Sequence, residues 1–563
     1  MVKINNMHYL FVLILALSFF NLKAQDNKES QKVYYHYYNN GIADTSSVHT
    51  ILYNDGIVYL SKPYDKIRYF MDYGNKQNVT ILSYIDNLFA TTYSFDSLPE
   101  SVLKDDTETI LGYKCSLASY KVFSNSIDVW YTEESSLQGS PYSRYIPNEN
   151  ALVLKVVING NRTLIADSII TLSDNESYGF PIDSCVILTD PELEELKIKS
   201  RYETISVFKN ETINFDPDHW TGNDFDSVSG VYHFSKGAVI LKKVLLSESV
   251  NSGDEVYAKL TCWSAGDAYD RTGSVFAIVP NNSEISMLDA LSDGLSILPL
   301  YYDNNGKKYQ GIVATENYSP QIELMRFFTS FGVGHFNDLR IINNYPWKDA
   351  AIYNQDITTM FPADVDEIWV GVFIGNYDKG GHRVNLDLNI YPSFNGKVNG
   401  SKYIQPLFST VNIMEMSSQE YGRLFDNDTL VVDFKIPDSI NNLRLLYTST
   451  GHGGWGGGDE FNPKLNQIFI DGKQIFSTIP WRTDCASFRL YNPASGNFGN
   501  GLSSSDLSRS NWCPATLTPP YYIELNNLSS GKHTIEVVID QGEDEGGSFN
   551  HWGITGVLVG DIE

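Results

Sequence analysis

This sequence of 563 residues has few cysteines, few basic residues and no histidine cluster, and each shortage excludes a class of protein. The five cysteines form no Cys-x-x-Cys pair and no cluster with histidine, so no zinc motif is visible and we expect neither a metal nor a cofactor. The ten histidines are scattered, without a His-x-His pair. Lys and Arg total 41 against 68 Asp and Glu, a net charge of −27. That charge excludes nucleic acid as a partner, because phosphate binding needs clustered basic residues.

Long apolar runs are absent except at the N-terminus, where the pattern predicts a signal peptide over residues 1–24. Lys3 supplies the positive charge, residues 9–20 are apolar apart from Ser18, and Leu22 and Ala24 stand at a cleavage position. The run is short for a membrane-spanning helix, and no later segment approaches the required length. We therefore expect an exported protein, periplasmic or secreted, with no membrane span.

No heptad or helical repeat is visible, whereas aromatic residues make up 13% of the chain and favour strands. Many short apolar or alternating runs predict an all-β fold of sandwiches or jelly rolls. We expect a β-rich N-terminal domain at 25–195 and two further β-domains at 196–395 and 396–563. The acidic, helix-prone residues 191–199 are interpreted as a linker. Residues 467–476 predict a hairpin that turns at Asp471-Gly472.

Two acidic residues stand in unusual local sequences. Asp270 lies in Gly-Asp-Ala-Tyr-Asp-Arg at 266–271, and Glu460 follows a glycine-rich run at 451–458. A glycine run costs backbone entropy unless close approach or positive φ is needed, and such loops often border ligands. A single acid of this kind more often caps a turn or faces water. A pair of acids, however, suits hydrolysis of an amide or glycosidic bond, where one activates water and the other protonates or polarises the leaving group.

Export permits disulfides, and with five cysteines at least one stays unpaired within the chain. Cys485 and Cys513 flank a loop rich in Gly, Ser and Asn, and we expect them to be bonded.

Several motifs together are similar to a known family. They are residues 268–271, residues 325–329, the glycine-rich loop ending in Glu460, and Arg509 followed by Trp512-Cys513-Pro514. On these motifs, residues 205–563 resemble the bacterial peptide-N4-(N-acetyl-β-glucosaminyl)asparagine amidases of the peptide-N-glycosidase F (PNGase F) type. The resemblance implies two adjacent eight-stranded jelly rolls with the active site at their interface. Residues 110–115 and 128–132 resemble the GLPGLI-type β-domains exported by Bacteroidetes, and the N-terminal domain resembles the bowl-like domain of the longer form of these enzymes.

The resemblance also implies roles for individual residues. Asp270 matches the principal catalytic acid and Glu460 the acid after the glycine-rich loop, and we expect their carboxyl groups within roughly 10 Å of each other. Arg271, beside Asp270, is expected to hold that carboxylate ionised. The remaining substrate-binding candidates are Tyr269, His452, Trp455, Arg509 and Trp512. The tryptophans either stack on sugar rings or anchor the core, and His452 either contacts sugar or only bonds within its loop.

This sequence departs from the family pattern in three ways. No acid occupies the position of the family's third acid on the strand at 367–375, Tyr269 replaces a tryptophan, and Cys262 lacks its disulfide partner. Introducing an acid on the strand at 367–375 would test whether the missing third acid limits activity.

The function implied is hydrolysis of the Asn–N-acetylglucosamine amide of N-glycosylated proteins or glycopeptides, which converts Asn to Asp, by a monomer. Two alternatives remain open. Jelly rolls also serve as non-catalytic glycan- or protein-binding modules, which the missing third acid favours and the pair Asp270 and Glu460 disfavours. A copper monooxygenase on the same paired architecture would need histidine clusters that the sequence lacks.

Overall fold

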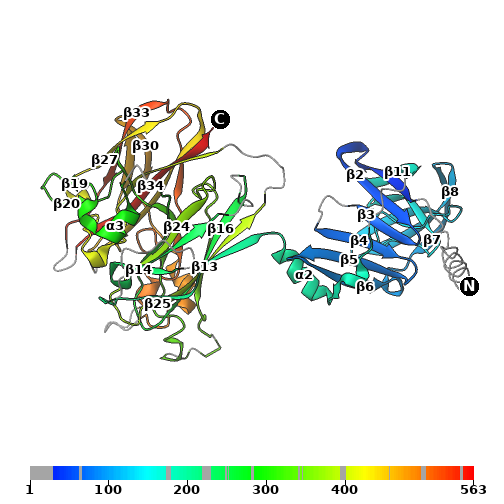
Figure 1. Ribbon diagram of the computed structural model, residues 1–563, viewed down its shortest axis with the longest axis horizontal. Helices are drawn as coiled ribbons and strands as arrows, with labels where there is room; N and C mark the ends of the chain where they lie inside the picture. The colour runs from blue at the N-terminus through cyan, green and yellow to red at the C-terminus, as the bar shows by residue number, and fades with distance from the viewer. Residues whose placement is uncertain are drawn as a thin grey trace, which may run out of the picture. The chain divides into compact units, whose positions relative to one another are not determined.

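The computed structural model places the protein in two compact units, Met1–Ser200 and Arg201–Glu563 (Figure 1). It describes residues 30–562 apart from 62–65, 173–178, 219–229, 247–249, 251–252, 281–284, 340, 342, 345, 393–400, 455–456, 496–502 and 545–548; the side chains of 45–48 and 61 are likewise not described. The expected signal peptide, residues 1–24, lies outside the described residues. Strands are the predominant secondary structure in each unit, so the all-β prediction is confirmed.

The first unit contains one 12-stranded sheet, in which each strand pairs with its neighbours in an almost continuous meander. In sheet order the strands are β12 (Val186–Ile187), β6 (Asn87–Ser94), β5 (Gln77–Tyr84), β4 (Ile67–Asp72), β3 (Ile57–Ser61), β2 (Ile42–Asn54), β1 (Gln31–Asn39), β11 (Arg162–Thr171), β10 (Leu152–Ile158), β9 (Asn125–Thr132), β8 (Tyr113–Val122) and β7 (Val102–Ile110). Figure 1 shows β2 to β6 running side by side. Three buried apolar clusters within this unit give it a core of its own.

Residues 191–199, the helix-prone segment interpreted as a linker, form most of helix α2 (Asp190–Lys199). Thr189 and Glu192 make a capping box at its start, which explains why the helix begins there. Leu193 is buried, and Lys66 Nζ donates to the carbonyl of Ser200 at 3.2 Å. The helix therefore packs as part of the first unit and ends where that unit ends.

The second unit begins with a β-sandwich of two sheets. One sheet holds β13 (Glu203–Ile213), β25 (His382–Tyr391), β16 (Glu255–Ser264) and β23 (Ala351–Asp356). The facing sheet holds β14 (Tyr232–Phe234), β15 (Val239–Leu245), β24 (Glu367–Ile374), β17 (Thr272–Ile278), β22 (Ile322–Phe328) and β31 (Leu517–Thr518). Strand β31 comes from far along the chain and pairs with β22 through Arg326 and Phe327. The C-terminal part of the sequence thus completes the first sandwich.

The second sandwich packs four strands on four. One sheet has the order β26 (Lys402–Ser409), β34 (His551–Ile562), β28 (Ile440–His452) and β32 (Tyr521–Glu524), and the other β27 (Leu430–Ile436), β33 (Gly531–Ile539), β29 (Asn466–Ile470) and β30 (Lys473–Thr478). The predicted hairpin is confirmed: β29 and β30 are joined at Asp471-Gly472, both with positive φ. The smaller elements of this unit are β18 (Ile285–Ser286), α3 (Met287–Asp293), β19 (Leu300–Tyr302), β20 (Lys308–Gln310) and β21 (Tyr318–Ser319).

The two sandwiches share buried surface. The largest apolar cluster joins strands of the first sandwich to Leu446 and Val557 of the second. A fully buried ion pair reinforces this joint: Arg326 bonds Glu323 through two nitrogens, and its Nη1 donates to Thr450 Oγ1 at 2.9 Å. Because a buried charge left unpaired is costly, this pair fixes how β22 lies against β28. Residues 201–563 form one compact unit, and the predicted boundary near residue 395 stays a prediction.

Within the described part of the chain, no helix combines the length and the apolar character needed to cross a membrane.

Candidate active site

A cavity of about 440 Å³ opens where the two sandwiches meet. Its walls come from the loop before β17, the end of β24, the short 3-10 helix Glu415–Ser417 (η6), the glycine-rich loop after β28 and the start of β34. Its lining residues are Asp270, Arg271, Thr272, Gly375, Glu415, Tyr421, His452, Gly453, Gly454, Glu460, Phe461, Trp512, Phe549 and His551. Both acids singled out in the sequence therefore face one hollow.

Asp270 lies in the loop between β16 and β17, and β22 holds that loop in place. Just beyond β22, the Thr329 hydroxyl accepts the backbone N–H of Arg271 at 2.7 Å, and the Thr329 N–H donates to the Arg271 carbonyl at 2.9 Å. Within the loop, Arg271 forms a two-pronged ion pair with Asp267, at 2.7 and 3.2 Å. The Asp267–Arg271 ion pair thus links the two ends of segment 266–271, and Asp270 between them faces the cavity.

Glu460 follows the glycine-rich loop, and the close approach expected of that loop is present. A Cβ on Gly453, whose φ is 144°, would lie 1.9 Å from Asn550 Oδ1, so only glycine fits there. The preceding residue, Asp459, is fully buried and accepts the N–H of Gly542 and, at 2.8 Å, the indole N–H of Trp552. Asp459 is therefore the anchor of the loop, and Glu460 is the acid that the loop presents.

Arg509 joins the two acids. Its Nη1 contacts Glu460 Oε1 and lies 3.0 Å from Asp270 Oδ2, while its Nη2 donates to the Ser504 carbonyl at 2.7 Å. Asp270 comes from the first sandwich, whereas Glu460 and Arg509 follow β28 of the second. The expected convergence across the interface is thus present, because both carboxylates meet one guanidinium nitrogen.

Burial dominates the electrostatics of this triad. It raises the pKa of Asp270 above its ordinary value, although Arg509 and then Arg271 oppose the shift. Burial also raises the pKa of Glu460, to about 7. The positive charge of Arg509 lowers this pKa, and the negative charge of Asp270 raises it further. One guanidinium cannot neutralise two buried carboxylates, so the pair retains a proton near neutral pH. A carboxylate and a carboxylic acid side by side can accept and donate protons in one reaction cycle.

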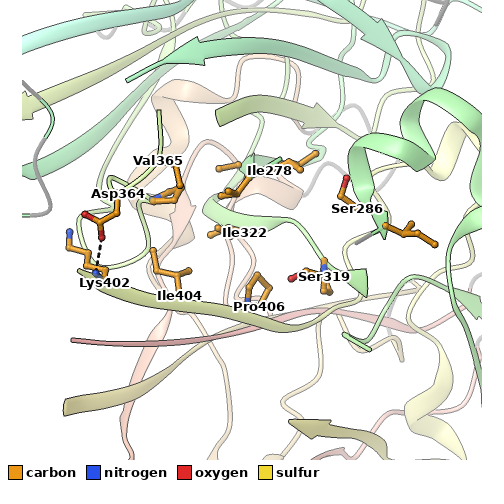
Figure 2. A pocket seen from close by; sticks show the side chains of 14 residues that line it. Ile278, Ser286, Ser319, Ile322, Asp364, Val365, Lys402, Ile404 and Pro406 are labelled. Atoms are coloured by element: carbon orange, nitrogen blue, oxygen red, sulfur yellow. Dashed lines mark hydrogen bonds between the residues drawn. The ribbon is translucent and has the colours of Figure 1, made fainter. Parts of the chain in front are cut away.

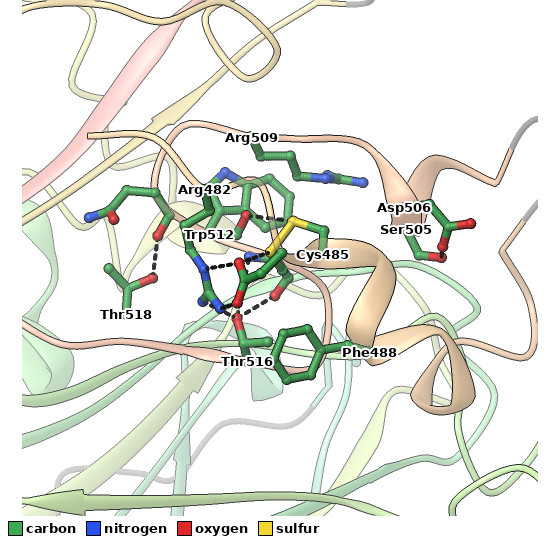
Figure 3. Close-up of a disulfide and its surroundings, with 12 residues drawn as sticks. Arg482, Cys485, Phe488, Ser505, Asp506, Arg509, Trp512, Thr516 and Thr518 are labelled. Atoms are coloured by element: carbon green, nitrogen blue, oxygen red, sulfur yellow. Dashed lines mark hydrogen bonds and ion pairs between the residues drawn. A yellow bond between two sulfur atoms is a disulfide. The ribbon is translucent and has the colours of Figure 1, made fainter. Parts of the chain in front are cut away.

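Arg509 is itself only 1% exposed, and the surrounding residues fix it. Its guanidinium carbon lies 4.3 Å from the ring centre of Trp512 and 5.1 Å from that of Phe461. The predicted disulfide is confirmed, with Cys485 and Cys513 bonded at a Cα–Cα distance of 5.1 Å. Figure 3 shows the disulfide beside Trp512, with Arg509 on the same segment. The cross-link ties the segment bearing Arg509 and Trp512 to the 3-10 helix Cys485–Tyr491.

Two histidines form part of the cavity wall. The rings of His452 and His551 are stacked with centres 4.9 Å apart, and His452 Nε2 bonds Thr450 Oγ1 at 3.0 Å. Burial lowers the pKa of His551 to about 4 and that of His452 well below its ordinary value. Both rings are therefore neutral near pH 7.

Two of the expected roles need revision. The charge of Arg271 does favour ionised Asp270, as expected, but its guanidinium is bound by Asp267, and Arg509 provides the direct contact with Asp270. Trp512 offers no open face for a sugar, since it is 4% exposed, stacks on Phe328 and donates its indole N–H to Gly451. The loop-anchoring interpretation of Trp512 is the one the structure supports.

The other expected contacts stay predictions. Tyr269 is 55% exposed and its ring lies 5.2 Å from the Arg271 guanidinium carbon, so it is accessible beside the cavity. His452 lines the cavity but is nearly buried. Trp455 lies outside the described residues.

The cavity contains an acid that the sequence did not reveal. Along the strand at 367–375, Glu367 lies at the start of β24 and away from the cavity, and Gly375 lies at the cavity wall. A Cβ on Gly375 would be 2.7 Å from Oε1 of Glu415, which reaches this place from η6. An acid restored at Gly375 would therefore collide with Glu415.

Other contributors were also missed. Asp267 had a signal, since it stands four residues before Arg271 in the segment already singled out. Glu415, Tyr421 and His551 lie in ordinary local sequence, and only the tertiary fold brings them to the cavity.

A second cavity, of about 290 Å³, lies elsewhere along the joint between the sandwiches (Figure 2). Its walls are mainly apolar, from residues such as Ile278, Ile322 and Ile404. At its polar end the Lys402 ammonium donates to the Thr358 carbonyl at 2.7 Å, and the Lys402 backbone N–H donates to Asp364 at 2.8 Å. The polar groups of Lys402 and Asp364 are thus bonded to one another or to Thr358.

Comparisons with known proteins bear on the whole chain. The family model described as "Peptide-N-glycosidase F, N terminal" matches residues 204–390, and that described as "Peptide-N-glycosidase F, C terminal" matches residues 420–559. A third, "N-glycanase peptide, N-terminal domain", matches residues 68–185. No curated protein sequence matches.

Solved structures of PNGF-II are similar over nearly the full length. One, in space group P21, is 39% identical with a TM-score of 0.80, covering 95% of this chain and 100% of that one. Another, in space group C2, is 39% identical with a TM-score of 0.77, covering 95% and 98%. PNGase F, a glycosylasparaginase from Flavobacterium meningosepticum, is 13% identical with a TM-score of 0.42, covering 64% and 96%.

Proposed function

Because this chain belongs to the peptide-N-glycosidase F family, we propose that it hydrolyses the amide joining an Asn side chain to the first N-acetylglucosamine of an N-linked glycan. The products are an Asp residue and a glycosylamine. One observation carries the proposal: Asp270 and Glu460, from the two sandwiches, meet one nitrogen of Arg509 in a cavity.

In the proposed reaction, Asp270 accepts a proton from a water molecule as the water oxygen attacks the amide carbon. Glu460, which retains its proton to about pH 7, donates to the amide nitrogen as the C–N bond breaks. Arg509 keeps the two carboxyl groups in place and stabilises the negative charge that develops between them. The proton taken from water by Asp270 replaces the one that Glu460 gave up, so the pair returns to its starting state.

The test is incubation of the purified protein with a denatured N-glycoprotein in water enriched in heavy oxygen. Mass spectrometry should show Asn converted to Asp carrying one heavy oxygen at the glycosylated position, together with the released glycan. If the glycan stays attached, the amidase proposal fails, and retention of glycopeptide without turnover would favour a glycan-binding module.

Two variants test the roles of the acids. Asp270→Asn and Glu460→Gln should each lower kcat/KM by about 10²- to 10⁴-fold, because an amide keeps the shape but can neither accept nor donate the transferred proton. Their thermal stability should stay close to that of the parent, since each variant replaces a buried carboxyl group by a neutral one. Asp433→Asn is the control, because Asp433 lies on the exposed side of β27 and accepts a hydrogen bond from Thr534, away from the cavity. Full activity in Asp270→Asn would contradict the role of Asp270 as the general base.

A further inference from the structure

Glu415 is the third carboxyl group of the cavity, and its two oxygens differ in their surroundings. Oε2 accepts the hydroxyl of Tyr421 at 2.8 Å and lies 3.5 Å from Asn412 Nδ2. Oε1 is buried, with no hydrogen-bond partner among the described residues. Buried polar atoms without partners are rare in native proteins, so this oxygen calls for a functional explanation.

The surroundings hold Glu415 firmly at the cavity wall. The Tyr421 hydroxyl that donates to it also bonds the Tyr377 hydroxyl at 2.6 Å, which extends the network to the residues after β24. On the other side Oε1 lies against Gly375, where any larger residue would displace it. The carboxyl group is thus positioned by two tyrosines and a glycine.

Burial raises the pKa of Glu415 to about 7, against the hydrogen bond from Tyr421 and the charge of Arg271. The titratable groups that face it are Tyr377, Tyr421 and Arg271, and the same cavity holds Asp270, Glu460, His452 and His551. Because Oε2 already accepts from Tyr421, the retained proton belongs on Oε1, the oxygen without a partner. A carboxylic acid kept neutral in this way is a hydrogen-bond donor.

We infer that Glu415 is a further substrate-contacting residue of this site, which donates a hydrogen bond from its carboxyl group to an uncharged oxygen acceptor of the first sugars, an N-acetyl carbonyl or a hydroxyl. The inference rests on the proposed function for the identity of the ligand. It assigns Glu415 to sugar binding and leaves proton transfer to Asp270 and Glu460.

The experiment measures equilibrium binding of the disaccharide of two N-acetylglucosamine units, N,N′-diacetylchitobiose, by calorimetry at pH 6 and pH 8. Binding by the parent protein should weaken at pH 8, where Glu415 loses its proton. Glu415→Ala should bind about tenfold more weakly than the parent at pH 6, the usual effect of losing one hydrogen bond. Glu415→Gln keeps an N–H donor that does not titrate, so it should bind like the parent at pH 6 and weaken less at pH 8.

Two further variants complete the design. Gly375→Ala keeps the acid but displaces it, and should weaken binding as Glu415→Ala does. Glu524→Gln is the matched control. Glu524 is an exposed residue of β32 that forms an ion pair with Arg444 of β28, away from the cavity. Thermal unfolding of each variant confirms that it is folded.

The inference is overturned if folded Glu415→Ala binds as tightly as the parent, if Glu415→Gln keeps the full pH dependence, or if the parent binds no disaccharide. The readout needs no turnover, so it separates this inference from the proposed function. Disaccharide binding with the expected pattern but no release of glycan would retain Glu415 as a sugar contact and reject the amidase activity. Glycan release together with unchanged disaccharide binding in the Glu415 variants would support the amidase activity and reject Glu415 as a sugar contact.

Discussion

Three side chains far apart in the sequence share one proton and one positive charge in this site. Asp270 and Glu460 each have a pKa raised by burial, and Arg509 lies between them as their common partner. Two acids that interact this closely titrate as a pair, so the protonation state of the pair, and not that of either acid alone, sets the working range.

The pair predicts a bell-shaped dependence of kcat/KM on pH. Above about pH 7 the pair loses its last proton, because the raised pKa of Glu460 lies there, and the rate should fall. On the acid side the rate should fall as Asp270 gains a proton, at a pH above the ordinary range for Asp because burial raises its pKa. Glu460→Gln should remove the alkaline decline in kcat from whatever activity remains, because the decline in binding that Glu415 causes acts through KM. A parent profile that stays flat to pH 9 would contradict the shared proton.

The second prediction at the residue scale concerns replacement of Arg509 by lysine. Lysine carries the same charge but presents one point donor, so Arg509→Lys cannot contact both acids and the Ser504 carbonyl together. We expect kcat/KM to fall about 10²-fold, because the acids lose their common partner. Arg482→Lys is the control, since Arg482 pairs with Asp484 near the disulfide and does not line the cavity. Equal activity in the two variants would show that the bridge has no part in catalysis.

At the scale of elements, the disulfide between Cys485 and Cys513 stabilises the segment that carries Arg509 into the active site. Cys485 and Cys513 are 28 residues apart, and Cys513 directly follows Trp512, on which the Arg509 guanidinium lies. The cross-link therefore restrains the segment that positions the bridging arginine.

Replacing both Cys485 and Cys513 by Ser should lower the free energy of unfolding by about 3–4 kcal/mol in the chain-entropy model for a loop of this length. Activity should fall as well, since the Arg509 segment becomes less restrained. Denaturant titration and a glycopeptide assay measure the two effects. Cys185→Ser, at a free cysteine of the first unit, is the control and should change neither. A double variant as stable as the parent would mean that packing around Trp512 holds the segment without the bond.

How far the sequence predicts this structure depends on how local each feature is. The hairpin at Asp471-Gly472 follows from its own turn residues, and the disulfide was expected from its flanking loop. Glu415 could not be predicted, because its importance depends on Gly375 and Tyr377 of the first sandwich. For Trp512 the sequence left sugar stacking and loop anchoring both open, because only the packing of Phe328 and Arg509 shows that its ring is covered.

At the scale of the whole molecule, each compact unit has its own buried clusters. Helix α2 ends with the first unit, and the division between the units falls at Ser200–Arg201. Units with separate cores generally fold independently.

A protein lacking residues 25–200 should therefore stay folded and soluble. Scanning calorimetry of the full chain should show a transition of the first unit that the shortened protein lacks, while the transition of residues 201–563 keeps its temperature. A shortened protein without any cooperative transition would show that the second unit needs the first.

Strand β31 has a consequence for how the chain is made. The sheet that supports Asp270 acquires its last strand from residues 517–518, and Arg509 also comes from this late part of the chain. While the chain is still emerging from the ribosome, β22 therefore presents an unpaired edge, which can pair with other chains. Asp270 meanwhile has no Arg509 beside it. A chain that stops short of β31 carries both an open sheet edge and an incomplete site, so truncated products of this gene should aggregate and should be inactive.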